Sequence, residues 1–251
     1  MTPITLPRLG WGNPHATRHA LIVHGLGSSA QTGWQLGSGL AEADWYATAV
    51  DLRGHGVAPR APRYRISDFA TDLVHTQPEH GGAWDVVIGH SIGAAAAVVA
   101  QAGAPKWARK LILLDPALAL SAERKELVRT GQLYSHDYLT EDEVAIDSPH
   151  WHPLDVELRV WSNRAASRFA LEHAVIDNPH WDTTEQAKRL AVSTLVVGGD
   201  PAVDSLFSGE HAEAVLASQP LMTHVVITGA GHSVHRDKPE ETLSHIMRFL
   251  V

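Results

Sequence analysis

The pentapeptide G-H-S-I-G at residues 89–93 constrains the fold of this chain more than any other segment. The apolar run 84–88 before it predicts a buried strand, and the Ala- and Val-rich run 94–102 after it predicts a buried helix. A G-x-S-x-G motif between a strand and a helix is typical of a sharp, strained turn that lifts the serine hydroxyl above the sheet. The glycines leave room for that turn, because a Cβ at either position would clash. We therefore interpret Ser91 as a nucleophile rather than as the cap of a helix in a Gly-rich loop.

Length and composition limit the classes of protein to consider. The 251 residues suffice for one large α/β domain with an inserted subdomain. With 20 basic and 28 acidic residues the net charge is −8, which argues against a nucleic-acid partner. The absence of cysteine excludes disulfides, thiolate metal sites and a cysteine nucleophile. No apolar stretch approaches the length of a membrane span and the first residues do not match a signal peptide, so we expect a cytoplasmic protein with no membrane partner.

Short apolar runs alternate with helix-like segments along most of the chain. Strands this uniformly apolar, separated by helices, predict the α/β class: a mostly parallel central sheet with helices on both faces. The expected strands span residues 20–23, 46–50, 84–88, 110–114, 194–197 and 224–227. The expected helices of this core span 31–43, 67–75 with Ser67 as N-cap, 94–102 and 239–249.

The interval 118–190 breaks this alternation, because it contains helix-like segments and no convincing strand. Its best helices span 121–133 and 153–173. We expect a helical cap over 118–190, inserted into a core formed by 1–117 and 191–251. The aromatic residues of the cap either line a substrate pocket or pack the cap on the sheet, and packing is the more common role of buried rings. They are Tyr134, Tyr138, Trp151, Trp161, Phe169 and Trp181.

Three further motifs accompany the pentapeptide: H-G-L-G at 24–27, D-L-R-G-H-G at 51–56 and G-A-G-H at 229–232. Together with the order of strands and helices, they resemble the α/β-hydrolase fold family over nearly the whole chain outside the cap. The resemblance implies an oxyanion hole formed by the backbone N–H groups of Leu26 and Ile92. We interpret His24 and Arg53 as structural: the first braces its loop, and the second ties loops together.

The resemblance also implies a catalytic triad in the chain order serine, acid, histidine. His232 lies in the loop after the last predicted strand, where the family carries its general base. His235, three residues further on, is the rival for this role, but its position in the loop matches less well. We therefore predict that His232 takes the proton of Ser91 and later passes it to the leaving group.

The acid of the triad has three candidates. Asp200 follows the strand 194–197, where the family normally places its acid, and we expect that strand end to lie beside the histidine loop. Asp115 follows the strand 110–114, which matches a minority of the family, and Asp204 lies four residues beyond Asp200. We predict Asp200 as the acid and keep Asp115 and Asp204 as alternatives.

His150 and His152 flank a tryptophan in an H-x-H pattern. Two histidines without a third ligand at suitable spacing rarely form a metal site. The sequence therefore predicts no metal ion, and a serine–histidine–acid mechanism requires no cofactor.

These observations predict a cofactor-independent serine hydrolase that cleaves a small-molecule carboxylic ester or lactone with an apolar or aromatic acyl part through an acyl-enzyme. A serine nucleophile disfavours dehalogenase and epoxide-hydrolase chemistry, for which relatives use a carboxylate at that position. Two alternatives remain open: hydrolysis of a C–C bond in a diketone by the same triad, and a small-molecule-binding protein without turnover. The sequence predicts no particular oligomeric state.

Overall fold

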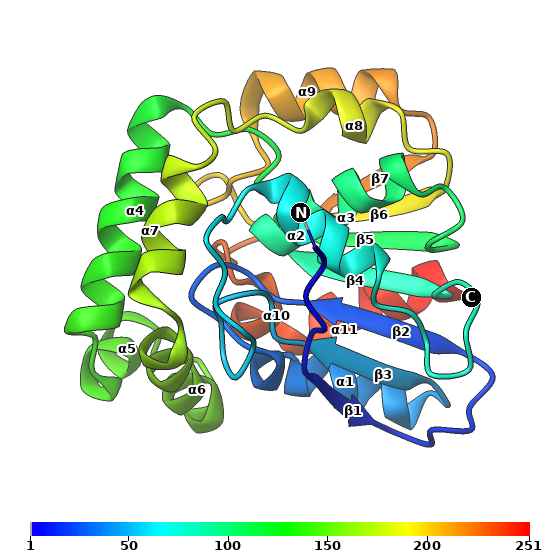
Figure 1. The fold of residues 1–251 in the computed structure, drawn as a ribbon, viewed down its shortest axis with the longest axis horizontal. Coiled ribbons are helices and arrows are strands. Elements are labelled where there is room, and N and C mark those ends of the chain that lie inside the picture. Colours follow the sequence, from blue (N-terminus) through cyan, green and yellow to red (C-terminus); the bar gives the residue numbers. More distant parts are fainter. Residues whose placement is uncertain (1) are drawn as a thin grey trace.

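The computed structural model describes residues 2–251 and contains one seven-stranded sheet. Its strands are β1 (Arg8–Trp11), β2 (His19–Val23), β3 (Tyr46–Val50), β4 (Val86–His90), β5 (Lys110–Leu114), β6 (Ser193–Gly198) and β7 (Met222–Val226). They lie in the order β1-β3-β2-β4-β5-β6-β7, and every neighbouring pair is parallel except β1 with β3 (Figure 1). The predicted α/β class with a mostly parallel sheet is therefore confirmed.

The strands β2 to β7 coincide with the predicted apolar runs to within about two residues. The antiparallel strand β1 was not predicted. It forms one edge of the sheet, where Arg8 lies opposite Val50 of β3, and its side chains are mostly exposed. An exposed edge strand buries neither face, so no apolar run marks it in the sequence.

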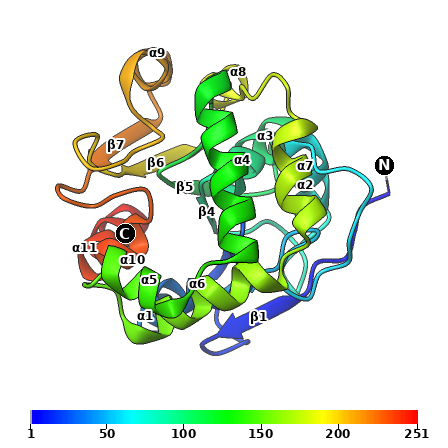
Figure 2. The ribbon, with the colours of Figure 1, turned by 90° about the vertical axis from the view of Figure 1, so that its left-hand side faces the viewer.

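Each face of the sheet buries its own apolar core. Leu21 and Val23 of β2 belong to one core, whereas Ala20 and Ile22 belong to the other, because side chains alternate along a strand. The face that buries Leu21 and Val23 is covered by α2 (Ile66–Val74), α3 (Ile92–Gly103), α8 (Thr184–Lys188) and α9 (Gly209–Ser218) (Figures 1 and 2). The opposite face is covered by the 3-10 helix η1 (Ala30–Gly33), α1 (Trp34–Glu42), α10 (Val234–Asp237) and α11 (Pro239–Leu250). None of the helices found in residues 2–251 is long and apolar enough to cross a membrane.

The interval 118–190 supplies a further group of helices and, within the described residues, no strand. Figure 2 shows four of them in front of the carboxyl ends of the strands: α4 (Ala122–Asp137), α5 (Glu141–Asp147), α6 (Pro153–Ala165) and α7 (Arg168–Ile176). The fifth, α8, packs against α3 and α9 and so contributes to the layer that covers the sheet. Four of the five helices found in this interval therefore stand apart from the sheet, and α8 packs on the core layer.

Two details of the predicted helices are wrong. Ser67 is not an N-cap: α2 begins one residue earlier, and Asp68 in its first turn accepts a hydrogen bond of 3.3 Å from the backbone N–H of Arg65.

The expected helix over 153–173 is divided into α6 and α7. Ser167 lies at the break, where its hydroxyl caps α7 and its backbone N–H donates to the carbonyl oxygen of Gly54 at 2.7 Å. That bond to the core holds the chain away from a continuous helix.

Candidate active site

Ser91 occupies the turn between β4 and α3, and its backbone has a φ of 55°. A positive φ is uncommon for a residue with a side chain and marks local strain. A Cβ on Gly89 would lie 2.7 Å from the Cα of Ala94, and one on Gly93 would overlap the carbonyl oxygen of His24. The predicted reason for both glycines is therefore confirmed. The strained turn places Ser91 at the edge of a pocket, with the N-terminus of α3 beside it.

His232 is paired with Asp115. The Nδ1 atom of His232 donates to Oδ2 of Asp115 at 2.6 Å, and His232 lines the same pocket as Ser91. The Asp115 carboxylate is fully buried and also accepts from the Ser205 hydroxyl at 2.6 Å and from the Leu206 N–H at 2.8 Å. Burial alone would raise the pKa of Asp115, but the bonds from His232, Leu206 and Ser205 outweigh it and hold the pKa below its ordinary value. Asp115 is therefore an ionised partner for His232.

The expectation that Asp200 partners His232 is wrong. Asp200 instead holds the base of the histidine loop: its Oδ2 accepts from the Gly229 N–H at 2.9 Å, and its backbone N–H donates to the Ala230 oxygen at 2.7 Å. The loop then passes over the end of β6, where a Cβ on Gly199 would come within 2.6 Å of the Gly231 oxygen. It continues toward β4, so that the imidazole meets the acid that follows β5.

The other rivals for the triad serve different contacts. Asp204 forms an ion pair with Arg124, and half of its side-chain surface is exposed. His235 is buried against the ring of His90 at a centroid distance of 4.8 Å, and its Nδ1 has no hydrogen-bond partner in the described part of the chain. Among the histidines of residues 2–251, only His232 combines a carboxylate partner with a place in the pocket beside Ser91.

Leu26 and Ile92 line the same pocket as Ser91. Ile92 is the first residue of α3, so its N–H has no partner within the helix. Within residues 2–251 no hydrogen bond from the N–H of Leu26 or Ile92 is found. Two backbone donors with no protein partner, next to a serine, form an arrangement that can receive a negatively charged oxygen.

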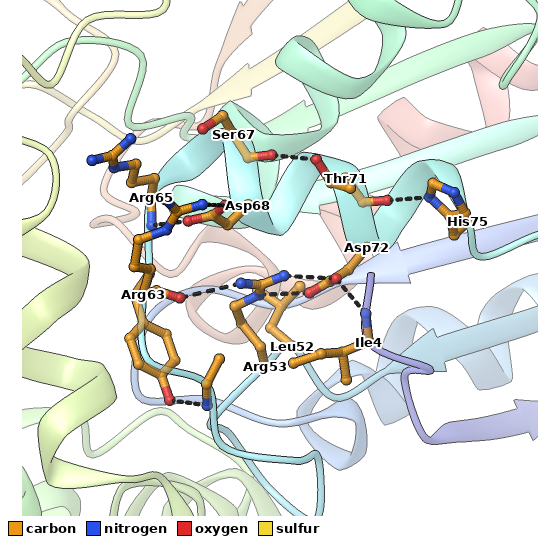
Figure 3. A network of polar contacts seen from close by, with 12 residues as sticks. Ile4, Leu52, Arg53, Arg63, Arg65, Ser67, Asp68, Thr71, Asp72 and His75 are labelled. Carbon is orange, nitrogen blue, oxygen red and sulfur yellow. Dashed lines mark hydrogen bonds and ion pairs between the residues drawn. The ribbon is translucent and has the colours of Figure 1, made fainter. Parts of the chain in front are cut away.

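The structural roles of His24 and Arg53 are confirmed. His24 bonds to the Gly25 oxygen at 2.7 Å through Nδ1 and accepts from the Leu52 N–H at 3.0 Å through Nε2. Arg53, fully buried, donates two hydrogen bonds of 2.7 and 2.8 Å to the carboxylate of Asp72 on α2 (Figure 3). These side chains join the loops that follow β2 and β3 to each other and to the core.

Ser91 and His232 open onto a cavity of about 570 Å³ between the sheet and the inserted helices. Of the six aromatic residues singled out in this interval, Tyr134, Trp151 and Trp181 line the cavity. Trp181 also serves packing, because it is buried and its Nε1 donates to the Ala117 oxygen at 2.7 Å. Phe169 lies outside the cavity lining and stacks on His173 instead.

The H-x-H pair is used in other ways. His152 caps α6 by accepting from the Leu154 N–H at 3.1 Å, and His150 lies 3.2 Å from a carboxylate oxygen of Asp237. Across residues 2–251 no group of three or more metal-binding side chains of the His, Cys, Asp or Glu type is found.

Two arginines that the sequence does not single out also line the cavity, Arg159 on α6 and Arg236 on α10. Arg236 follows the histidine loop closely in sequence, but nothing in its neighbours indicates burial of a charged side chain. Arg159 lines the cavity because of where α6 lies relative to the sheet, and the sequence of α6 does not indicate that placement.

Comparisons with known proteins agree with this architecture. The Alpha/beta hydrolase family profile matches residues 20–245. The chain is 28% identical to Esterase YbfF of Escherichia coli over 95% of each chain, and 34% identical to Lipase LipV of Mycobacterium tuberculosis over 50% of this chain and 48% of the lipase. The crystal structure of E-2-(acetamidomethylene)succinate hydrolase superposes with a TM-score of 0.84 at 24% identity, covering 98% of this chain and 95% of that one. This chain therefore belongs to the alpha/beta hydrolase family.

Proposed function

We propose that this chain is a cofactor-independent serine hydrolase that cleaves a carboxylic ester or lactone with a triad of Ser91, His232 and Asp115. The observation that carries the proposal is the 2.6 Å hydrogen bond between His232 and the buried Asp115 carboxylate, at the edge of a pocket that also contains Ser91. Similarity to an esterase and to a lipase supports ester chemistry.

In the proposed triad each nitrogen of His232 has its own role, and the hydrogen bond to Asp115 supports this division. A neutral imidazole carries one proton, and the Nδ1 that faces the carboxylate holds it. The other nitrogen, Nε2, is then free to accept the proton of Ser91 as its oxygen attacks the substrate carbonyl. The imidazolium that results is stabilised by the Asp115 carboxylate and returns the proton to the departing alcohol. A water molecule, activated by the same nitrogen, then hydrolyses the acyl-enzyme.

The tetrahedral intermediates carry a negatively charged oxygen, for which the N–H groups of Leu26 and Ile92 are the proposed donors. Such a donor contributes roughly 3–4 kcal/mol to transition-state stabilisation in other hydrolases. We also propose residues 118–190 as a cap over the core formed by 1–117 and 191–251, with the cap enclosing the acyl or alcohol part of the substrate.

The test is turnover of p-nitrophenyl esters and lactones by the wild-type chain and by Ser91→Ala. We expect the variant to fold and to lose at least about 10³-fold in kcat. A fluorophosphonate should label Ser91, and EDTA should leave the rate unchanged. Inertness toward esters with turnover of a ring-cleavage diketone would favour C–C bond hydrolysis, and binding without turnover of either would favour a binding protein.

A further inference from the structure

Two arginines from different parts of the chain line the cavity that holds Ser91. Arg159 comes from α6 in the inserted helices, and Arg236 comes from α10, four residues after His232. Arg236 is only 5% exposed and Arg159 is half-buried. Buried arginines normally lie against a carboxylate, since taking an unpaired charge out of water is costly.

No ion pair of either arginine with a carboxylate occurs in residues 2–251. The two carboxylates whose charge acts on Arg236 are those of Asp155 and Asp237, and both accept hydrogen bonds from other groups. The Asp155 carboxylate accepts from the indole N–H of Trp34 at 2.9 Å, and the Asp237 carboxylate accepts from the indole N–H of Trp151 at 2.6 Å. The guanidinium of each arginine is therefore not neutralised by direct contact with an acid.

Arg236 is nevertheless held in a defined position. Its Nη2 donates to the Ser28 hydroxyl at 3.2 Å, and its guanidinium lies over the Trp151 ring at 5.1 Å from the centroid. Its Nε is buried without a hydrogen-bond partner anywhere in the described part of the chain. Such a fixed donor, short of an acceptor, is suited to a ligand that brings its own oxygen atoms.

The arginines also repel each other. Burial, and secondly the nearby charge of Arg236, lowers the pKa of Arg159 to about 10. The remaining charged groups of the cavity lining do not compensate: Arg124 and Asp204 pair with each other, and Asp147 is exposed. With three arginines and two aspartates in the lining, the cavity has an excess of positive charge that an anion would offset.

We propose that Arg159 and Arg236 together bind a carboxylate of the substrate, so that the enzyme selects a small ester or lactone that carries a free carboxylate group. The planar, forked donors of a guanidinium match the two oxygens of a carboxylate. The inference rests on the proposed function, because it takes the cavity beside Ser91 as the place where the substrate binds.

The first experiment compares two p-nitrophenyl esters of similar shape: the glutarate monoester, which carries a carboxylate, and the neutral pentanoate ester. We expect the wild-type kcat/KM to be at least about tenfold higher for the glutarate, the effect of one hydrogen-bonded charge pair. Arg159→Gln should remove most of this ratio by raising KM for the glutarate, and Arg159→Lys should restore part of it. The matched control is Arg164→Gln, an exposed position on the same helix. An equal or lower kcat/KM for the glutarate, or a ratio unaffected by Arg159→Gln, would overturn the proposal.

The second experiment measures binding without catalysis, so that the two proposals can fail separately. The Ser91→Ala chain should be stabilised against thermal unfolding by monomethyl glutarate, which carries one free carboxylate, but not by the neutral methyl pentanoate, and Arg159→Gln or Arg236→Gln in that background should abolish the shift. Stabilisation by inorganic phosphate as strong as by monomethyl glutarate would overturn the assignment to a carboxylate. If monomethyl glutarate binds but no ester is cleaved, the anion site stands and the proposed esterase activity is wrong. If only the neutral ester is cleaved, the proposed esterase activity stands and the anion site is wrong.

Discussion

The imidazole of His232 and the carboxylate of Asp115 are joined by a 2.6 Å hydrogen bond across the carboxyl end of the sheet. Asp115 has a φ of 37°, a second strained position, directly after β5, that matches the position of Ser91 directly after the neighbouring strand β4. Its carboxylate also accepts from Ser205 and from backbone N–H groups that include Leu206. Bonds to both oxygens leave the carboxylate little freedom, so that it fixes the orientation of the imidazole.

Asp115→Asn should inactivate the enzyme and Asp200→Asn should not. An amide at position 115 can stabilise the wrong tautomer of His232, which costs on the order of 10⁴-fold in kcat in another triad. Asp200→Asn keeps an oxygen for the Gly229 N–H and should cost less than about tenfold. The measurement is kcat on one ester for both variants, with circular dichroism as the folding control. A fully active Asp115→Asn enzyme would remove Asp115 from the triad.

The sequence identified Ser91 and His232 as candidates but favoured Asp200 over Asp115 as the acid, for a reason that lies in the path of one loop. The neighbour relations of β5, β6 and β7 follow from consecutive parallel strands. What strand order does not specify is that residues 229–231 cross the end of β6 before the histidine. The crossing depends on long-range contacts, among them the bond from Gly231 N–H to Asp237 at 2.7 Å.

The fold likewise contains features that follow from the local sequence and features that depend on distant parts of the chain. The buried strands are evident from apolar runs, because burial on both faces leaves a continuous signal. The edge strand β1 and the break at Ser167 depend on partners far away in sequence, Val50 and Gly54. The cavity arginines belong to this second group as well, since a charged residue in a helix is ordinarily solvated.

Replacing Arg53 by glutamine should destabilise the chain strongly. The residue is fully buried and its two bonds to Asp72 connect the loop after β3 with α2 (Figure 3). Removing one partner of a buried pair leaves an uncompensated charge, a loss of about 3–5 kcal/mol in the free energy of unfolding. Urea denaturation measures it. Arg109→Gln is the control, because that side chain is 72% exposed in its pair with Asp85 and the change should be below about 1 kcal/mol.

Stability should fall as the pH decreases from about 6.5 to 4. Burial, opposed by a bond to the Gly25 oxygen, lowers the pKa of His24 to about 4, and burial together with the nearby His24 lowers that of His55 to about 3. Both pKa values lie below that of an unfolded histidine, about 6.5, so the unfolded chain takes up protons first as the pH falls. Each group then contributes a slope of up to about 1.4 kcal/mol per pH unit, and the loss is complete below the folded pKa.

The check is the free energy of unfolding from urea titrations between pH 7.5 and 5. His55→Asn retains a donor toward the Arg53 oxygen but cannot be protonated, so its slope should correspond to about one proton fewer than that of the wild type. His75→Asn, at an exposed position, should leave the slope unchanged. A free energy of unfolding that is independent of pH over this range would contradict the prediction.

Gly93→Ala should destabilise the chain although it replaces glycine by the best helix former. In an unconstrained helix this change is favourable by roughly 1 kcal/mol. At position 93, however, the new Cβ would overlap the carbonyl oxygen of His24 and lie 2.7 Å from that of Val23, both of which are backbone atoms that cannot rotate away. Relief requires α3 to move off β2, which also shifts Ser91. Gly103→Ala, on the same helix with no heavy atom within 4 Å of the added carbon, should be neutral or stabilising in thermal unfolding. Equal melting temperatures for the two variants would show that the turn around Ser91 accommodates a side chain at position 93.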